Sequence, residues 1–138
     1  MGRKIIVALL IIFFLTTPKI AAVQLNTLLT TEGLNTKGKP VTVKQEFDLK
    51  QDKGVQYYVE WNSDNKDHDV ALRWFGPRDQ LVNFLYVANF SNNIVRDYIS
   101  FEEETSTQYF VPQYSGQYSI HLYLDHQLVS ITNFRIDK

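Results

Sequence analysis

Hydrophobic and polar side chains alternate with a period of two along most of the chain after residue 39. This alternation is typical of strands that bury one face. No segment beyond residue 22 carries a sustained 3.6-residue apolar repeat, so we expect no helix there. The pattern predicts about eight strands, at residues 41–47, 55–61, 70–74, 80–90, 94–101, 109–111, 117–124 and 128–136.

Turn-forming residues separate these segments. They occur at residues 51–54, in the Asn- and Asp-rich stretch 62–69, at Gly76-Pro77 and at 125–127. Short strands with antiparallel patterning and no crossover helix predict an all-β fold. We expect an antiparallel two-sheet β-sandwich, immunoglobulin-like or jelly-roll-like, with a closed barrel as the main alternative. Within this sandwich, Trp74 and Tyr118 should be central, because both lie on the apolar side of their alternation.

Residues 1–22 have the form of a secretory signal peptide. A basic start at Arg3 and Lys4 precedes an unbroken apolar run over residues 5–15, and residues 18–22 close it with small and turn-prone side chains. A helix of that run rises about 16 Å, about half the hydrocarbon core of a bilayer. We therefore expect cleavage after Ala22 and no stable membrane insertion afterwards. An uncleaved anchor is the alternative, because Ile20 is larger than the usual residue three positions before a cut.

The remaining chain divides into an N-terminal arm, residues 23–39, and a β-sandwich domain, residues 40–138. The arm is rich in polar side chains, and only Val23, Leu25, Leu28, Leu29 and Leu34 are sizeable and apolar. These residues could also let the arm lie as an edge strand on its own sheet or on a neighbouring one.

Composition and charge restrict the class of protein. The chain has 138 residues, with 14 Lys and Arg against 15 Asp and Glu, so it offers no basic excess for a nucleic acid partner. It has no cysteine, which excludes disulfides, thiolate zinc sites and cysteine nucleophiles. Small exported animal domains usually carry disulfides. We therefore expect a bacterial protein that is secreted or periplasmic.

Two stretches carry a resemblance to known β-sandwich families. Residues 114–120 place Gly116 two positions before Tyr118, and this resembles the start of the sixth strand of immunoglobulin-like domains, in which Trp74 would be the core tryptophan. Tyr114 stands where those domains have Asp. Landmarks at Phe47, 54–61, 69–72 and 115–118 are also similar to bacterial pre-peptidase-type β-sandwiches. The second resemblance implies an accessory or recognition module and not a catalyst.

Candidate catalytic and metal-binding residues are few. His68 lies among Asp64, Asp67 and Asp69, but their spacing matches no known calcium or zinc motif, so we expect neither a metal nor another cofactor. Ser115 is not followed by a strand-to-helix elbow, and Glu102 to Glu104 fall in one loop. We predict that the protein is not an enzyme, and we interpret His121 and His126 as surface residues.

Aromatic residues give the stronger functional signal, with eight Tyr, nine Phe and two Trp. The alternation directs Tyr58 and Tyr123 outward, together with His121 and Ser130, whereas Leu122, Leu124, Val129 and Ile131 should anchor the last hairpin in the core. Exposed tyrosines anchor protein interfaces or stack on sugars. We predict a binding module for a protein partner, with Tyr123, His121 and Tyr58 as binding residues.

Two other functions stay open at this point, a carbohydrate-binding module and a small secreted hydrolase. Clustering of Tyr58, Tyr86, Tyr98 and Tyr123 on one flat face would favour a sugar ligand. Convergence of histidine and acidic side chains in a cleft would favour an enzyme.

Overall fold

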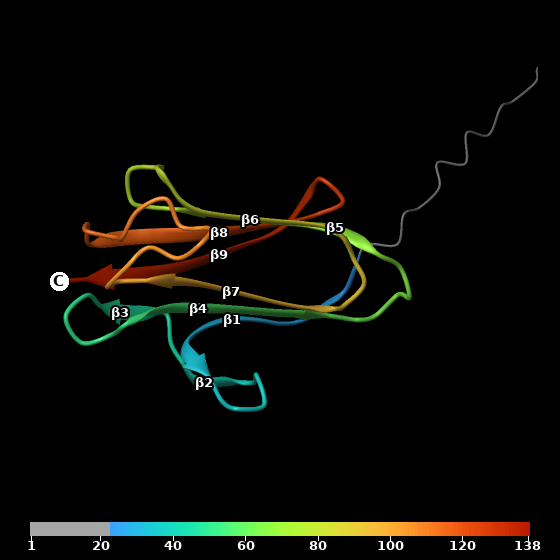
Figure 1. The fold of residues 1–138 in the computed structure, drawn as a ribbon, viewed down its shortest axis with the longest axis horizontal. Helices are drawn as coiled ribbons and strands as arrows, with labels where there is room; N and C mark the ends of the chain where they lie inside the picture. The colour runs from blue at the N-terminus through green and yellow to red at the C-terminus, as the bar shows by residue number, and fades with distance from the viewer. Residues whose placement is uncertain (1–22) are drawn as a thin grey trace, which may run out of the picture.

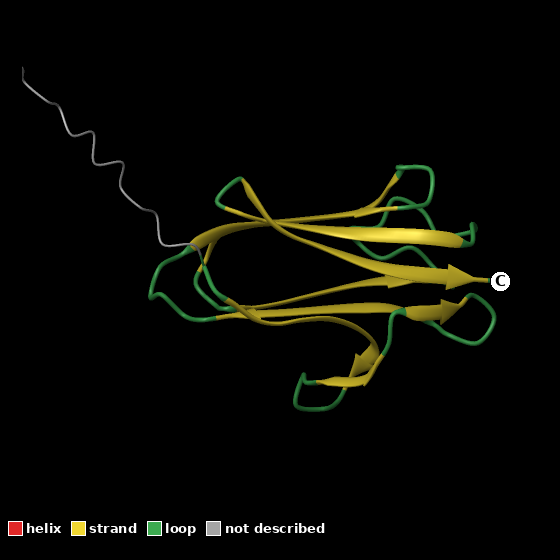
Figure 2. Ribbon diagram, turned by 180° about the vertical axis from the view of Figure 1, so that it is seen from behind, coloured by secondary structure: helices red, strands yellow, loops and turns green. Residues whose placement is uncertain are grey.

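The computed structural model describes residues 23–138, and these form two stacked β-sheets (Figure 1, Figure 2). One sheet has the order β2-β1-β4-β7 and the other has the order β3-β9-β8-β5-β6. This part of the chain contains no helix, and so none that could cross a membrane. The predicted signal peptide lies outside the described residues. The strands are β1 Leu25–Leu34, β2 Pro40–Val43, β3 Glu46–Asp48, β4 Gly54–Trp61, β5 His68–Phe75, β6 Leu81–Phe90, β7 Ile94–Ser100, β8 Gly116–Leu124 and β9 Gln127–Asp137.

The inward faces of the two sheets share one aromatic core. Trp74 is 0 % exposed and Tyr118 is 1 % exposed, which confirms the predicted centre. The Trp74 ring meets the Phe134 ring edge-on at 5.8 Å, and Tyr118 stacks on Phe134 at 5.4 Å. The Tyr118 hydroxyl donates a hydrogen bond to the backbone carbonyl of Tyr114 at 2.7 Å. This contact resembles the tyrosine corner of immunoglobulin-like domains.

A buried carboxylate joins the two sheets in this cysteine-free core. Asp97, on β7 of the four-stranded sheet, accepts hydrogen bonds from Trp74 Nε1 and Asn83 Nδ2 of the five-stranded sheet, both at 2.8 Å. Burial raises the pKa of Asp97 to about 6, although these donors and the backbone N–H of Tyr98 oppose the shift. The cluster fixes the position of Trp74 because its indole N–H and the Asn83 amide both donate to the same carboxylate oxygen across the two sheets.

The segment predicted as one strand at 41–47 is two strands in different sheets. Thr42 has a φ of 50°, a left-handed conformation that is uncommon outside glycine. After it the chain leaves the four-stranded sheet, and β3 pairs in parallel with the end of β9. Val43 is therefore 61 % exposed while Phe47 is 2 % exposed, although they are in phase in the sequence. The predicted single alternation was wrong here because the chain changes sheets.

Two other predicted elements need correction. The segment predicted as an arm, with an edge strand on its own sheet as the alternative, forms the strand β1, which pairs with both β2 and β4, so the sandwich includes residues from Leu25 onward. Residues 109–111 form no strand. Instead, Gln108 forms an isolated bridge to Asn83, and its side chain exchanges hydrogen bonds with the backbone of Ser100.

The last hairpin has a different register from the one predicted. A bulge falls between Leu122 and Tyr123, so Leu122 pairs with Ser130 and His121 pairs with Ile131. Residues directly opposite each other point to the same face. Ser130 therefore shares the inner side of Leu122. Ile131 is 50 % exposed and Val129 is 38 % exposed, so neither anchors the hairpin as expected.

Candidate functional site

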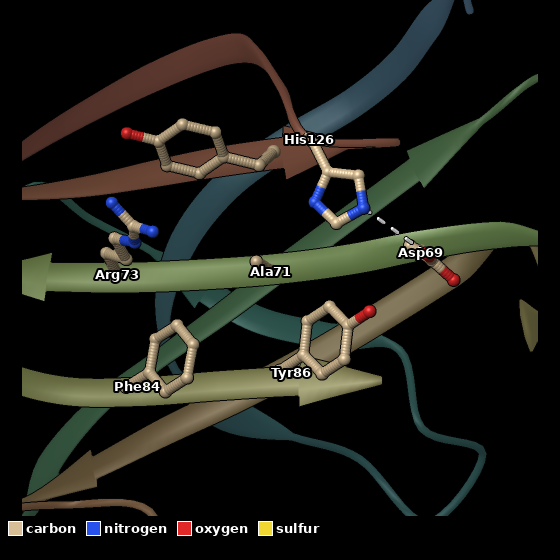
Figure 3. Close-up of a pocket in the computed structure, with 7 residues that line it drawn as sticks. Asp69, Ala71, Arg73, Phe84, Tyr86 and His126 are labelled. Atoms are coloured by element: carbon tan, nitrogen blue, oxygen red, sulfur yellow. Dashed lines mark ion pairs between the residues drawn. The ribbon is translucent and has the colours of Figure 1, made fainter. Parts of the chain in front are cut away.

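The outer face of the five-stranded sheet carries a hollow of about 280 Å³. It is lined by Asp69, Ala71, Arg73, Phe84, Tyr86, Tyr123 and His126. Ala71, on β5, is the direct cross-strand partner of both Tyr86 on β6 and Tyr123 on β8. A methyl side chain between two large aromatic neighbours leaves a depression, and Figure 3 shows Ala71 between the Arg73 and Asp69 ends of it.

Arg73 forms the cationic end of the hollow. Its guanidinium lies 4.8 Å from the centre of the Tyr123 ring and 5.9 Å from the centre of the Phe84 ring. Contacts of this kind are cation–π interactions, and they hold the guanidinium plane between aromatic side chains. Tyr123, a predicted binding residue, thus lies in the wall of the hollow.

His121, the second predicted binding residue, lies outside this lining. It pairs with Arg73 across the strands, its ring packs on Phe75 at 4.8 Å, and its Nε2 is 3.2 Å from the Ser119 hydroxyl. Burial and then the charge of Arg73 lower the pKa of His121 below its usual value of 6.5. Within residues 23–138 no carboxylate contacts this serine–histidine pair, so it lacks the acidic group that orients the base in a hydrolase triad.

Asp69 forms the opposite, anionic end. Its carboxylate accepts a hydrogen bond from the backbone N–H of Asn89 at 3.0 Å and lies 3.6 Å from Nε2 of His126, the contact dashed in Figure 3. Partial desolvation and the charge of Asp69 raise the pKa of the Tyr86 hydroxyl above its usual value of 10.0. Asp69 is therefore already engaged by neighbouring groups of the same chain.

The turn that carries His126 is held in place by a buried histidine, His68, which contacts the preceding turn residue Asp125. Asp125 and His126 both have positive φ, 51° and 66°, as a two-residue type I′ hairpin requires. Asp125 accepts hydrogen bonds from the backbone N–H of Asp69 at 3.0 Å and from His68 Nδ1 at 2.7 Å. The other ring nitrogen of His68 lies 3.0 Å from Asp64. This group, His68 with Asp64 and Asp125, is called the histidine clip below.

The histidine clip requires a protonated His68. A neutral imidazole can donate from only one nitrogen, whereas both nitrogens of His68 face carboxylates. Burial alone would lower the pKa of His68, but the hydrogen bonds and charges of Asp125 and Asp64 outweigh it and raise the pKa above 6.5. His68 is 5 % exposed, so we assign it a structural role. Within residues 23–138, no group of three or more His, Cys, Asp or Glu side chains is arranged so that it could hold a metal ion.

Tyr58, the third predicted binding residue, is not available to a partner. It points outward from the four-stranded sheet as predicted, yet it is 1 % exposed. The Lys39 ammonium lies 3.3 Å from its hydroxyl, and the Arg96 guanidinium lies 5.8 Å from its ring centre. Tyr98 is also on that sheet. Of the four tyrosines considered for a flat sugar platform, only Tyr86 and Tyr123 line the hollow.

Comparison with known proteins supports the fold. No known protein family and no curated protein matches the amino-acid sequence. Among solved structures, an immunoglobulin-like protein from Pseudomonas aeruginosa matches with a TM-score of 0.54 and 11% identity, over 85% of this chain and 98% of that one. The chain has an immunoglobulin-like β-sandwich fold.

A second similar structure carries no weight for function. It is an alkylpurine DNA glycosylase from Pseudomonas fluorescens bound to DNA with an abasic site analogue, with a TM-score of 0.46 and 9% identity. The match covers 84% of this chain and 30% of that one. Since an immunoglobulin-like sandwich hosts many functions, the function of this chain has to be argued from its own surface.

Proposed function

We propose that this chain is an exported, non-catalytic recognition module that binds a protein partner through the outer face of its five-stranded sheet. The proposal combines the signal-like residues 1–22 with the hollow around Ala71. The place of action is then the periplasm or the medium. The immunoglobulin-like fold agrees with a module of this kind, although it is not specific for one.

The observation that carries the proposal is the continuity of the hollow with exposed aliphatic side chains. Tyr123 pairs with Leu128, which is 48 % exposed, and His121 pairs with Ile131, which is 50 % exposed. On the other side of Ala71, Tyr86 is 48 % exposed. An apolar surface with aromatic side chains and an arginine at its centre matches the composition of protein interfaces.

The same observation favours a protein over a sugar. A sugar site needs flat aromatic faces open to the ligand and polar groups that receive its hydroxyls. Here the faces of Tyr123 and Phe84 flank Arg73, and the surface continues into leucine and isoleucine. Aliphatic side chains of this kind contribute to protein contacts through burial of apolar area.

The experiment is affinity capture from the native envelope and culture fluid with the purified mature chain. Tyr123→Ala serves as the test variant and Tyr58→Phe as the matched control, because Tyr58 is covered. We expect one or more proteins that the wild type and Tyr58→Phe retain and that Tyr123→Ala loses. Equal retention by all three chains would contradict the proposal. Binding to a glycan array that is lost in Tyr123→Ala would support the carbohydrate alternative instead.

Export is tested separately by mass spectrometry of the native protein. The expected result is a new N-terminus near Val23 in the periplasmic or extracellular fraction. An intact N-terminus at Met1 in the cytoplasmic fraction would contradict export.

A further inference from the structure

We propose that the hollow takes a carboxylate from the partner, in the form of an acidic side chain, and that Arg73 binds it. This inference rests on the proposed function, since it names the chemistry of the group that enters the same hollow. It depends on the state of the Arg73 guanidinium, on the charges around it and on the shape of the lining.

The Arg73 guanidinium has no acceptor within the described part of the chain. A guanidinium carries five N–H donors in a planar fork, and no hydrogen bond or ion pair from Arg73 to residues 23–138 is present. Its contacts are the faces of Tyr123 and Phe84. Aromatic neighbours restrict the Arg73 side chain but accept none of its N–H groups, so these donors stay available to a planar ligand.

Of the three other arginines in residues 23–138, two donate to acceptors, and Arg78 shares the aromatic packing of Arg73 but lies outside the hollow. Arg96 also lies by a tyrosine, but its Nε donates to the carbonyl of Gly38 at 3.1 Å. Arg135 pairs with Asp137 at 2.8 Å. Arg78 packs on Tyr114 at 4.4 Å in the turn between β5 and β6, away from the residues that line the hollow. Among these arginines, Arg73 is the one that lines the hollow, and its guanidinium donates no hydrogen bond to any residue of the described part of the chain.

The charges nearby leave the Arg73 end positive. Asp69 lies four residues away along β5, about 13 Å at the usual rise of a strand, and it is engaged by Asn89 and His126. Ala71 separates the two ends (Figure 3). His121 is the direct neighbour of Arg73, and burial and the charge of Arg73 lower its pKa below 6.5, which favours its neutral form. Arg73 is exposed and accessible from solvent, and a carboxylate matches its fork in a bidentate way.

The lining also indicates what should accompany the carboxylate. Beyond Arg73, the floor is the methyl group of Ala71 and the wall is the ring of Tyr86. An acidic side chain next to an apolar residue would place its carboxylate on Arg73 and its neighbour over Ala71. A hollow of about 280 Å³ has room for such a pair of groups.

The experiment is an NMR titration of the mature chain with two capped peptides, acetyl-Leu-Glu-Leu-amide and acetyl-Leu-Gln-Leu-amide. We expect saturable shifts at Arg73 Nε and at the amides of Ala71, Tyr86 and Tyr123 with the Glu peptide. The Gln peptide should bind at least tenfold more weakly. Equal affinities, shifts confined to another surface, or no saturable shift with the Glu peptide would each overturn the inference.

Variants separate the fork from simple charge attraction. Arg73→Gln should weaken binding of the Glu peptide at least tenfold, and Arg73→Lys should weaken it measurably because an ammonium lacks the fork. Arg78→Gln removes the same charge from a tyrosine-packed arginine outside the hollow and should leave the affinity unchanged. Equal losses in Arg73→Gln and Arg78→Gln would overturn the inference in favour of general electrostatics.

The same variants distinguish a failure of this inference from a failure of the proposed function. If a captured protein needs Tyr123 but binds Arg73→Gln as tightly as the wild type, the carboxylate inference is wrong and the binding face stands. If the captured protein binds Tyr123→Ala and Arg73→Gln normally, both are wrong. Parallel loss in Tyr123→Ala and Arg73→Gln supports both.

Discussion

The outer faces of the two sheets each carry an outward-pointing tyrosine, but the two tyrosines differ in how far the rest of the chain covers them. Tyr58 on the four-stranded sheet is 1 % exposed beneath Lys39 and Arg96, whereas Tyr123 on the five-stranded sheet is half-buried in the wall of an open hollow. Both residues follow the same rule of alternation. The difference arises from what the chain places over each face.

Part of the chain that covers Tyr58 is a loop stabilised by side-chain hydrogen bonds. Residues 35–39 join β1 to β2, and the Asn35 side chain accepts hydrogen bonds from the backbone N–H groups of Lys37 and Lys39 at 2.9 and 3.0 Å. The hairpin stands out from the four-stranded layer in both ribbon views (Figure 1, Figure 2). Tyr58 is therefore covered by other parts of its own chain, whereas Tyr123 stays accessible from the hollow.

The largest expected effect concerns Trp74, on which both faces depend. Trp74→Ala should lower the free energy of unfolding by about 3 to 5 kcal/mol, because it opens the core and removes a donor from the buried Asp97 carboxylate. Urea unfolding of the wild type and the variant measures this. A loss below about 1 kcal/mol would be inconsistent with the packing described.

Tyr58→Ala should come next, with a loss of about 3 kcal/mol in the free energy of unfolding. The ring is buried and its hydroxyl is 3.1 Å from Glu60 as well as 3.3 Å from Lys39. Tyr123→Ala in the same urea experiment should lose about 1 kcal/mol or less, the usual size of a cross-strand contact. Equal losses would remove the contrast between the two faces.

Binding should show the reverse order. Tyr123→Ala should weaken the affinity for a captured partner by about 2 kcal/mol, measured by calorimetry, while Tyr58→Phe should leave it unchanged. His121→Ala should have a smaller effect than Tyr123→Ala, because His121 packs on Phe75 outside the hollow. A dominant effect of His121→Ala would move the contact surface away from Ala71.

The smallest expected effect is a pH dependence from the histidine clip, which links the start of β5 to the turn between β8 and β9. The pKa of His68 is raised above 6.5 in the folded state, so its stabilisation is complete below about pH 6.5 and is lost as the pH rises through the folded pKa. The pKa values of Asp64 and Asp125 are lowered from 3.8, and their contributions are lost only in acid, as the pH falls through the folded pKa values.

His68→Gln isolates this dependence. The difference in unfolding free energy between wild type and His68→Gln should shrink as the pH rises from about 6 to 9. Asp97, whose pKa is raised from 3.8 to about 6, stabilises the fold in its protonated form, so its contribution falls as the pH rises through the range between these values, mainly below that window, and it is present in both chains. A constant or growing difference would show that His68 is not held as a cation.

The sequence predicted the sandwich well because one-sided alternation reports burial directly. Trp74 and Tyr118 were placed in the core, and the outward direction of Tyr123 was correct. The pattern failed where the backbone departs from regular geometry. Thr42 has a positive φ before the chain changes sheets, and the bulge at Leu122 and Tyr123 shifts the register of Ser130.

The site itself was only partly predictable. Arg73 lies between two core residues, so its outward direction could have been read from the alternation, but its contacts with Phe84 and Tyr123 depend on cross-strand register. The sequence places His68 in the turn-forming stretch 62–69. Its burial depends on Asp125, 57 positions away, which no local pattern indicates.

Hydrogen–deuterium exchange of the mature chain with and without a captured partner tests the central claim most directly. The account predicts that protection on binding concentrates in β5, β6 and β8 around Ala71, Tyr86 and Tyr123, with β1, β2 and β4 unchanged. Protection confined to the hairpin over Tyr58 and its sheet would contradict the account.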